Sequence, residues 1–164
     1  MLKIGPSGGT GVGRAWDHES KTEIAQLIIS RSATCINYIH FVYVEDGGNK
    51  LVMSEKIGVD KGGSRSLNTI MLDYPHEVIT GVTGKYRVFY NDEKQLTSLT
   101  FVTNKRKYGP FEVSEPYPQE FDYHVGEKQF GGFFGTSSSD GIESIGIYLK
   151  PLKKLPVISS IKTE

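Results

Sequence analysis

Cysteine is nearly absent from this chain of 164 residues, with Cys35 as the only copy. A single cysteine cannot form an intramolecular disulfide. A chain of this length needs none, because it can bury roughly 68–70% of the surface that it exposes when unfolded. Cys35 lies in the apolar run 35–39, and nothing in the local sequence suggests the spatially adjacent histidine that a catalytic thiol needs. We therefore predict a small buried hydrophobe rather than a nucleophile.

Long apolar runs and an excess of charge are also missing. No stretch approaches the 18 apolar residues of a membrane-spanning helix. Residues 1–6 lack the apolar core of a signal peptide, which favours the cytoplasm or nucleus. The 19 basic and 19 acidic residues cancel, so no overall field attracts nucleic acid or an anionic membrane. We expect neither nucleic-acid binding nor membrane insertion.

Helical periodicity is scarce, whereas segments rich in β-branched and aromatic residues are common. The clearest of these are Ile36–Val44, Leu96–Thr103 and Thr80–Tyr90, the last with glycines that suggest bulges or a turn. Glycine-rich turn segments such as 46–49 and 61–64 separate them. Many short strands with glycine-rich turns predict an all-β sandwich, barrel or prism.

One phrase recurs three times in the sequence: an apolar residue, two spacers, an apolar residue, one spacer and a bulky apolar residue. The copies are residues 36–41, 96–101 and 142–147, and a Gly-Gly pair precedes each copy. The loose spacing does not fit a solenoid and favours one domain built from three similar β units. We assign this domain to residues 1–151 and expect 152–164 to be a mobile C-terminal tail.

Several segments resemble cofactor or metal sites but lack a required feature. The glycine-rich loop 8–13 follows only a short opening segment, opens no helix and lacks the Gly-Lys-Ser/Thr of a phosphate loop. The run 17–19 places three ligand types in a row, where neighbours of an extended segment point to opposite faces, so we predict a solvated turn. The basic run 105–107 reads as a charged hairpin turn. We expect no metal and no cofactor.

Loop 135–141 holds three serines but no nucleophile elbow, because Ser139 stands where the second glycine of Gly-x-Ser-x-Gly would be. Asp140 and Glu143 form a carboxylate pair that could suggest a glycosidase. Both belong to one tight loop, with no carboxylate clearly opposed across a cleft. Sugar binding by carboxylate and backbone is the better interpretation, so we predict no catalytic residues and no enzyme.

Four ordered segments resemble the jacalin-related lectins, and the mannose-type plant branch in particular. The opening segment 5–17 is similar to the family's Gly-Pro-Trp-Gly-Gly-Asn-Gly-Gly-Ser-x-Trp-Asp. The other matching segments are 74–84, 103–111 and 132–135 with 145–149. The resemblance covers roughly residues 3–151. It implies a β-prism of three four-stranded sheets with pseudo-threefold symmetry, in agreement with the repeated phrase.

The resemblance also implies one carbohydrate pocket, built from the opening glycine loop, a turn of the second unit and a Gly-x-x-x-Asp loop of the third. The residues carried over to this chain are Gly13 or Gly11, Lys85 and Tyr86, and Ser139, Asp140, Gly141 and Glu143. Two positions depart from the family pattern, because Ser139 replaces the glycine and Glu143 replaces the aspartate. Glutamate remains an acceptor-only carboxylate, but its head lies one methylene further out.

The resemblance thus implies a lectin that recognises mono- and oligosaccharides of glycoproteins, of mannose or glucose type, with homodimerisation as one route to avidity. A role in stress or defence would follow by family analogy. Two alternatives stay open: galactose-type or dual specificity, and a protein-interaction module that has lost sugar binding. The replacements at Ser139 and Glu143 motivate the second alternative.

Overall fold

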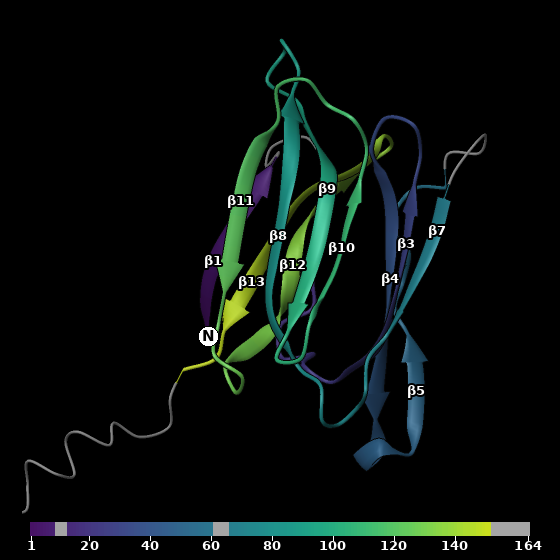
Figure 1. Ribbon diagram of the computed structural model, residues 1–164, viewed down its shortest axis with the longest axis vertical. Helices are drawn as coiled ribbons and strands as arrows, with labels where there is room; N and C mark the ends of the chain where they lie inside the picture. Colours follow the sequence, from purple (N-terminus) through teal and green to yellow (C-terminus); the bar gives the residue numbers. More distant parts are fainter. Residues whose placement is uncertain (9–12, 61–65, 152–164) are drawn as a thin grey trace, which may run out of the picture.

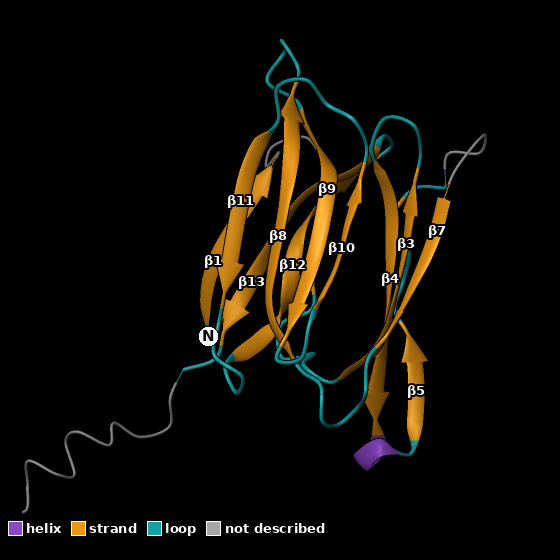
Figure 2. Ribbon diagram, viewed as in Figure 1, coloured by secondary structure: helices purple, strands orange, loops and turns teal. Residues whose placement is uncertain are grey.

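The computed structural model describes residues 1–8, 13–60 and 66–151, which form three antiparallel sheets and a single short 3-10 turn (Figure 2). The first sheet contains, in spatial order, β1 (Leu2–Gly8), β13 (Gly141–Leu149), β12 (Phe130–Ser138) and β2 (Arg14–Asp17). The second contains β5 (Lys50–Met53), β4 (Ile36–Glu45), β3 (Ile24–Arg31) and β7 (Ser66–Met71), with the two-residue strand β6 (Ile57–Gly58) also paired to β4. The third contains β10 (Lys107–Glu112), β9 (Lys94–Thr103), β8 (Ile79–Val88) and β11 (Gln119–His124). The 3-10 turn, η1 (Asp46–Gly48), joins β4 to β5.

Each sheet is built around one long hairpin, β3–β4, β8–β9 or β12–β13. The turns of these hairpins, residues 32–35, 89–93 and 139–140, lie at the upper end of the prism in Figure 1. We call this the hairpin end. The connections that carry the chain from one sheet to the next, residues 18–23, 72–78 and 125–129, lie at the opposite end. We call this the crossover end. The prediction of a β-prism with three four-stranded sheets is confirmed, with β5 and β6 as two pieces of one interrupted edge strand.

The repeated phrase marks the second strand of each central hairpin. All nine of its apolar positions are fully buried: Ile36, Ile39, Phe41, Leu96, Leu99, Phe101, Ile142, Ile145 and Ile147. Each sheet also supplies one phenylalanine to the centre, where Phe133 stacks on Phe41 at 5.4 Å and meets Phe101 edge-on at 5.6 Å. The phrase therefore specifies the face of each hairpin that forms the shared core.

Two minor predictions have different outcomes in the structure. Cys35 is fully buried, as predicted. The solvated turn at residues 17–19 is wrong for His18, which is only 3% exposed. Its ring nitrogens lie 2.6 Å from the Tyr43 hydroxyl and 2.8 Å from Glu55 Oε1. The neighbouring Asp17 and Glu19 stay exposed, because adjacent residues of an extended segment point to opposite sides.

Within the described ranges, no helix is long and apolar enough to span a membrane.

Candidate functional site

Three equivalent positions of the repeat meet at the hairpin end. Cys35, Gln95 and Gly141 each stand directly before the first apolar residue of the phrase. The backbone oxygen of Asp140 accepts from Cys35 Sγ at 3.2 Å and from Gln95 Nε2 at 3.3 Å. Gly141 has a φ of +134°, and a Cβ there would lie 2.6 Å from the Ile36 backbone oxygen. The β12–β13 turn is therefore held by the β3–β4 turn and by the start of β9.

The carboxylate of Glu143 lies beside Gly13, although these residues are far apart in the sequence. Glu143 is 4% exposed. A Cβ built on Gly13 would lie 1.7 Å from Glu143 Oε1 and 2.3 Å from the Ser137 backbone oxygen. Only glycine fits there without displacing the carboxylate. Gly13 was predicted to belong to the carbohydrate pocket, and in the structure the side chain of Glu143 occupies the space beside it.

Burial raises the pKa of the Glu143 carboxyl, and the negative charges of Glu93 and Asp140 act in the same direction. The Thr136 hydroxyl and the Gly13 backbone N–H lower this pKa by hydrogen bonding, but they do not outweigh the burial. Among the described residues, Glu143 Oε1 has no hydrogen-bond partner. The hairpin end thus contains a buried carboxylate oxygen that still requires a donor.

The rest of the third-unit loop is more open. Ser139 and Asp140 form the two-residue turn and are exposed, while Gly141 begins β13 and is buried. The backbone N–H of Asp140 donates to Ser138 Oγ at 3.0 Å within the turn. Gly11, the alternative to Gly13 in the opening loop, lies outside the described residues.

Lys85 and Tyr86, predicted from the second unit, lie within β8 rather than at the turn 89–93. The Lys85 ammonium is 2.8 Å from Glu112 Oε1 of β10, across the outer face of the third sheet. The Glu112 carboxylate raises the pKa of Lys85. Tyr86 packs against the core. The third sheet instead reaches the β12–β13 loop through the side chain of Gln95 and through the charge of Glu93.

Sequence reasoning missed Thr136, Gln95 and Glu93 as neighbours of the site. Gln95 and Cys35 had a usable signal, because each precedes a copy of the repeated phrase as Gly141 does, and pseudo-threefold symmetry brings equivalent positions to one axis. Thr136 had no such signal. In the described part of the chain, no cluster of three or more His, Cys, Asp or Glu side chains could hold a metal ion.

Comparison with protein families agrees with this architecture. The family model for the jacalin-like lectin domain matches residues 4–148. The chain is 37% identical over 169 aligned residues to the Arabidopsis thaliana protein RESTRICTED TEV MOVEMENT 1, covering 99% of this chain and 95% of that protein. It is 34% identical to Arabidopsis thaliana Jacalin-related lectin 2, covering 92% of this chain and 86% of that protein.

Solved structures of jacalin-related lectins have the same fold. An artocarpin–mannotriose complex superposes with a TM-score of 0.75 at 27% identity, covering 92% of this chain and 97% of that one. A mannose-specific jacalin-related lectin from Morus nigra, in complex with mannose, superposes with a TM-score of 0.74 at 29% identity, covering 92% and 94% of the two chains.

Proposed function

Because the chain belongs to the jacalin-related lectin family, we propose that it binds mannose- or glucose-type glycans reversibly at the hairpin end, without catalysing a reaction. The observation that carries this proposal is Glu143 Oε1, which lies beside Gly13 and has no hydrogen-bond partner among the residues that the structure describes. A buried charged acceptor without a donor is costly, and a sugar hydroxyl supplies such a donor. The mannose complexes of the structural relatives support the choice of sugar type.

In this binding mode Glu143 accepts hydrogen bonds from sugar hydroxyls, and Gly13 leaves room for the Glu143 carboxylate. The exposed turn of Ser139 and Asp140 forms one edge of the site, and Gly141 sets its geometry. Glutamate is one methylene longer than the aspartate of the family pattern. Its carboxylate therefore reaches the Gly13 N–H itself, and a sugar competes with this internal hydrogen bond. We expect weak monosaccharide affinity, near millimolar, or on the order of −4 kcal/mol.

The test is calorimetric titration of the full chain with methyl α-mannoside and, in parallel, galactose, for wild type, Glu143→Ala and Glu143→Asp. Replacement by alanine removes the acceptor and abolishes binding. Replacement by aspartate shortens the side chain, frees the Gly13 N–H and raises mannose affinity about tenfold. The Glu127→Ala variant, at the crossover end, is the matched control and binds like wild type.

Unchanged mannose binding in Glu143→Ala would exclude this site. Galactose binding without mannose binding would keep the lectin function and overturn the sugar type.

A second candidate function is a protein-interaction module without sugar binding. It is favoured by the N–H groups of Gly13 and Asp140, which are both engaged within the protein. In that case both sugars leave the calorimetric signal flat, including for Glu143→Asp. A partner recovered by affinity capture would then remain bound in the presence of excess mannose.

A further inference from the structure

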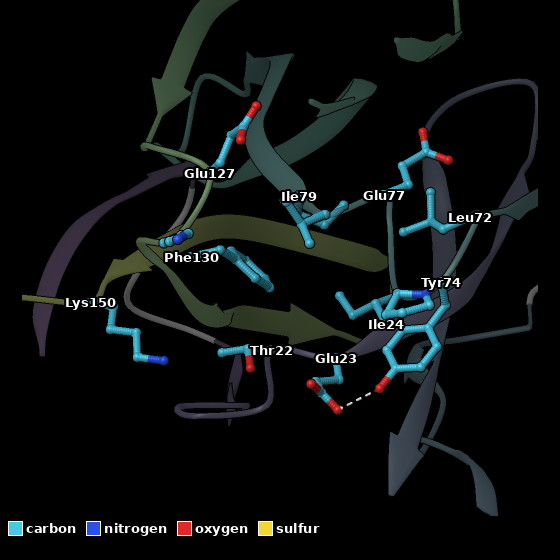
Figure 3. Close-up of a pocket in the computed structure, with 13 residues that line it drawn as sticks. Thr22, Glu23, Ile24, Leu72, Tyr74, Glu77, Ile79, Glu127, Phe130 and Lys150 are labelled. Atoms are coloured by element: carbon cyan, nitrogen blue, oxygen red, sulfur yellow. Dashed lines mark hydrogen bonds between the residues drawn. The ribbon is translucent and has the colours of Figure 1, made fainter. Parts of the chain in front are cut away.

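The crossover end holds a hollow on the axis of the prism. Its floor includes Ile24, Ile79 and Phe130, the first residues of β3, β8 and β12, so each sheet contributes one equivalent position. These side chains are 3%, 1% and 5% exposed. Residues of the three crossover connections line the sides of this hollow, which has a volume of about 340 Å³ (Figure 3). This volume lies in the range of small-molecule sites.

The carboxylates around this cavity are engaged or turned away. Glu23 accepts a hydrogen bond from the Tyr74 hydroxyl at 2.9 Å. Glu77 is 2% exposed and accepts from Thr103 Oγ1 at 2.6 Å and Tyr108 Oη at 2.8 Å. The carboxylate of Glu127 points away from the hollow in Figure 3. Glu77 is therefore committed to the fold, and Glu23 has one of its two oxygens engaged by Tyr74.

The two lysines that line the cavity differ from these carboxylates in having no charged partner nearby within residues 1–8, 13–60 and 66–151. Lys128 and Lys150 line the cavity, and neither ammonium group has a carboxylate within 4.0 Å among the described residues. Their backbones are held close together, because Lys150 N donates to the Gln129 carbonyl at 2.7 Å. The 125–129 connection is itself closed by the hydrogen bond from Gln129 N to the Gly126 carbonyl at 2.9 Å. Two lysines without a carboxylate within 4.0 Å in the described part of the chain therefore line this hollow beside its apolar floor.

We propose that this cavity is a second binding site, which takes a small amphipathic anion: one aromatic or branched aliphatic group on the Ile24–Ile79–Phe130 floor and a carboxylate at Lys128 and Lys150. Placing an apolar group on this floor removes its surface from water, and ring contact with Phe130 adds to the gain. The carboxylate forms charge-assisted hydrogen bonds with the two ammonium groups. The site is separate from the hairpin end and does not depend on sugar binding.

The test is an NMR titration of the full-length protein, labelled at isoleucine methyl groups, with indole-3-acetate as the probe. We expect the largest shifts at the methyl groups of Ile24 and Ile79. The neutral analogue indole-3-ethanol carries the same ring without the charge and binds at least fivefold more weakly. The Lys128→Gln/Lys150→Gln variant lowers affinity for the acid at least fivefold and leaves affinity for the alcohol unchanged. Lys50→Gln on β5 is the matched control and has no effect.

Three results would overturn the proposal. The first is equal affinity for the acid and the alcohol, and the second is the absence of shifts at Ile24 and Ile79. The third is a shift of these methyl groups with protein concentration alone, since the occupant is then a second copy of the chain. Mannose titration of the same lysine variants stays at wild-type affinity, so a failure here is distinguishable from a failure of the hairpin-end site.

Discussion

The prism buries one glutamate near each end, and the two carboxylates differ in how far hydrogen-bond donors satisfy them. Glu77, near the crossover end, is 2% exposed and accepts hydrogen bonds from the Thr103 and Tyr108 hydroxyls and from the Asp73 backbone N–H at 3.0 Å. Glu143, at the hairpin end, is 4% exposed and has one oxygen without a partner among the described residues. Burial raises the pKa of both, yet the hydrogen bonds from Thr103, Asp73 and Tyr108 bring that of Glu77 below its usual value, whereas that of Glu143 stays raised.

This contrast separates a carboxylate whose charge the fold satisfies from the carboxylate of the proposed sugar site. The donors of Glu77 come from the β7–β8 connection, β9 and β10, so its charge is satisfied by the fold and ties those elements together. Glu143 is desolvated to a similar extent with fewer donors. A desolvated acceptor that the fold leaves incomplete costs stability and is available to a ligand that brings a donor. We expect the two residues to respond oppositely to mutation and to pH.

The largest effect is expected for Glu77→Ala. Removing the carboxylate leaves three donors without their acceptor, and we expect a loss of about 3 kcal/mol in the free energy of unfolding, measured by urea denaturation. The exposed Glu127→Ala at the same end is the control and changes stability by less than about 0.5 kcal/mol. A loss of the same small size in both variants would show that Glu77 does not hold the crossover end together.

Gly13→Ala is expected to cost about 2 kcal/mol, because its Cβ would overlap Glu143 Oε1 and approach the Ser137 backbone oxygen. The double variant Gly13→Ala/Glu143→Ala removes the first contact and keeps the second. It should therefore recover about 1 kcal/mol of the cost, measured as a coupling energy in a double-mutant cycle. Additive effects would mean that Glu143 does not occupy the space beside Gly13.

The smallest but most specific effect concerns pH. The folded chain holds the proton of Glu143 more tightly than the unfolded chain, so its ionisation lowers stability as pH rises from about 4.5 through the raised pKa. Glu143→Gln should therefore match wild type at low pH and become the more stable protein above that window. Urea titrations between pH 4 and 8 measure this difference.

For Glu77 the pH dependence of stability has the opposite sign. Its folded pKa is depressed, so its contribution is present above the ordinary value of 4.5 and is lost as pH falls through the depressed pKa. The deficit of Glu77→Gln relative to wild type should be largest at neutral pH and shrink in acid. Parallel pH profiles for the two glutamine variants would contradict the assignment of different roles to the two glutamates.

Much of the fold was predictable from local patterns. The segments Ile36–Val44 and Leu96–Thr103 lie within β4 and β9, and the three copies of the phrase mark equivalent buried faces. The site was predictable only in part. Gly13, Asp140, Gly141 and Glu143 do lie together, but the turned-in carboxylate of Glu143 and the position of Lys85 within β8 were not foreseen. The cavity at the crossover end was not foreseen either, because its floor residues come from three separate sheets.

By itself, the sequence determined the strands, the turns and the threefold repetition, because alternation, turn residues and repeated phrases act over a few neighbours along the chain. Only the tertiary structure decided which polar groups are satisfied. Thr103 of β9 and Tyr108 of β10 reach Glu77 in the 72–78 connection. Cys35 reaches Asp140 across 105 positions, and Glu143 meets Gly13 from the far end of the chain. Whether a buried charge serves the fold or a ligand depends on donors brought by packing, and packing joins residues that local patterns do not relate.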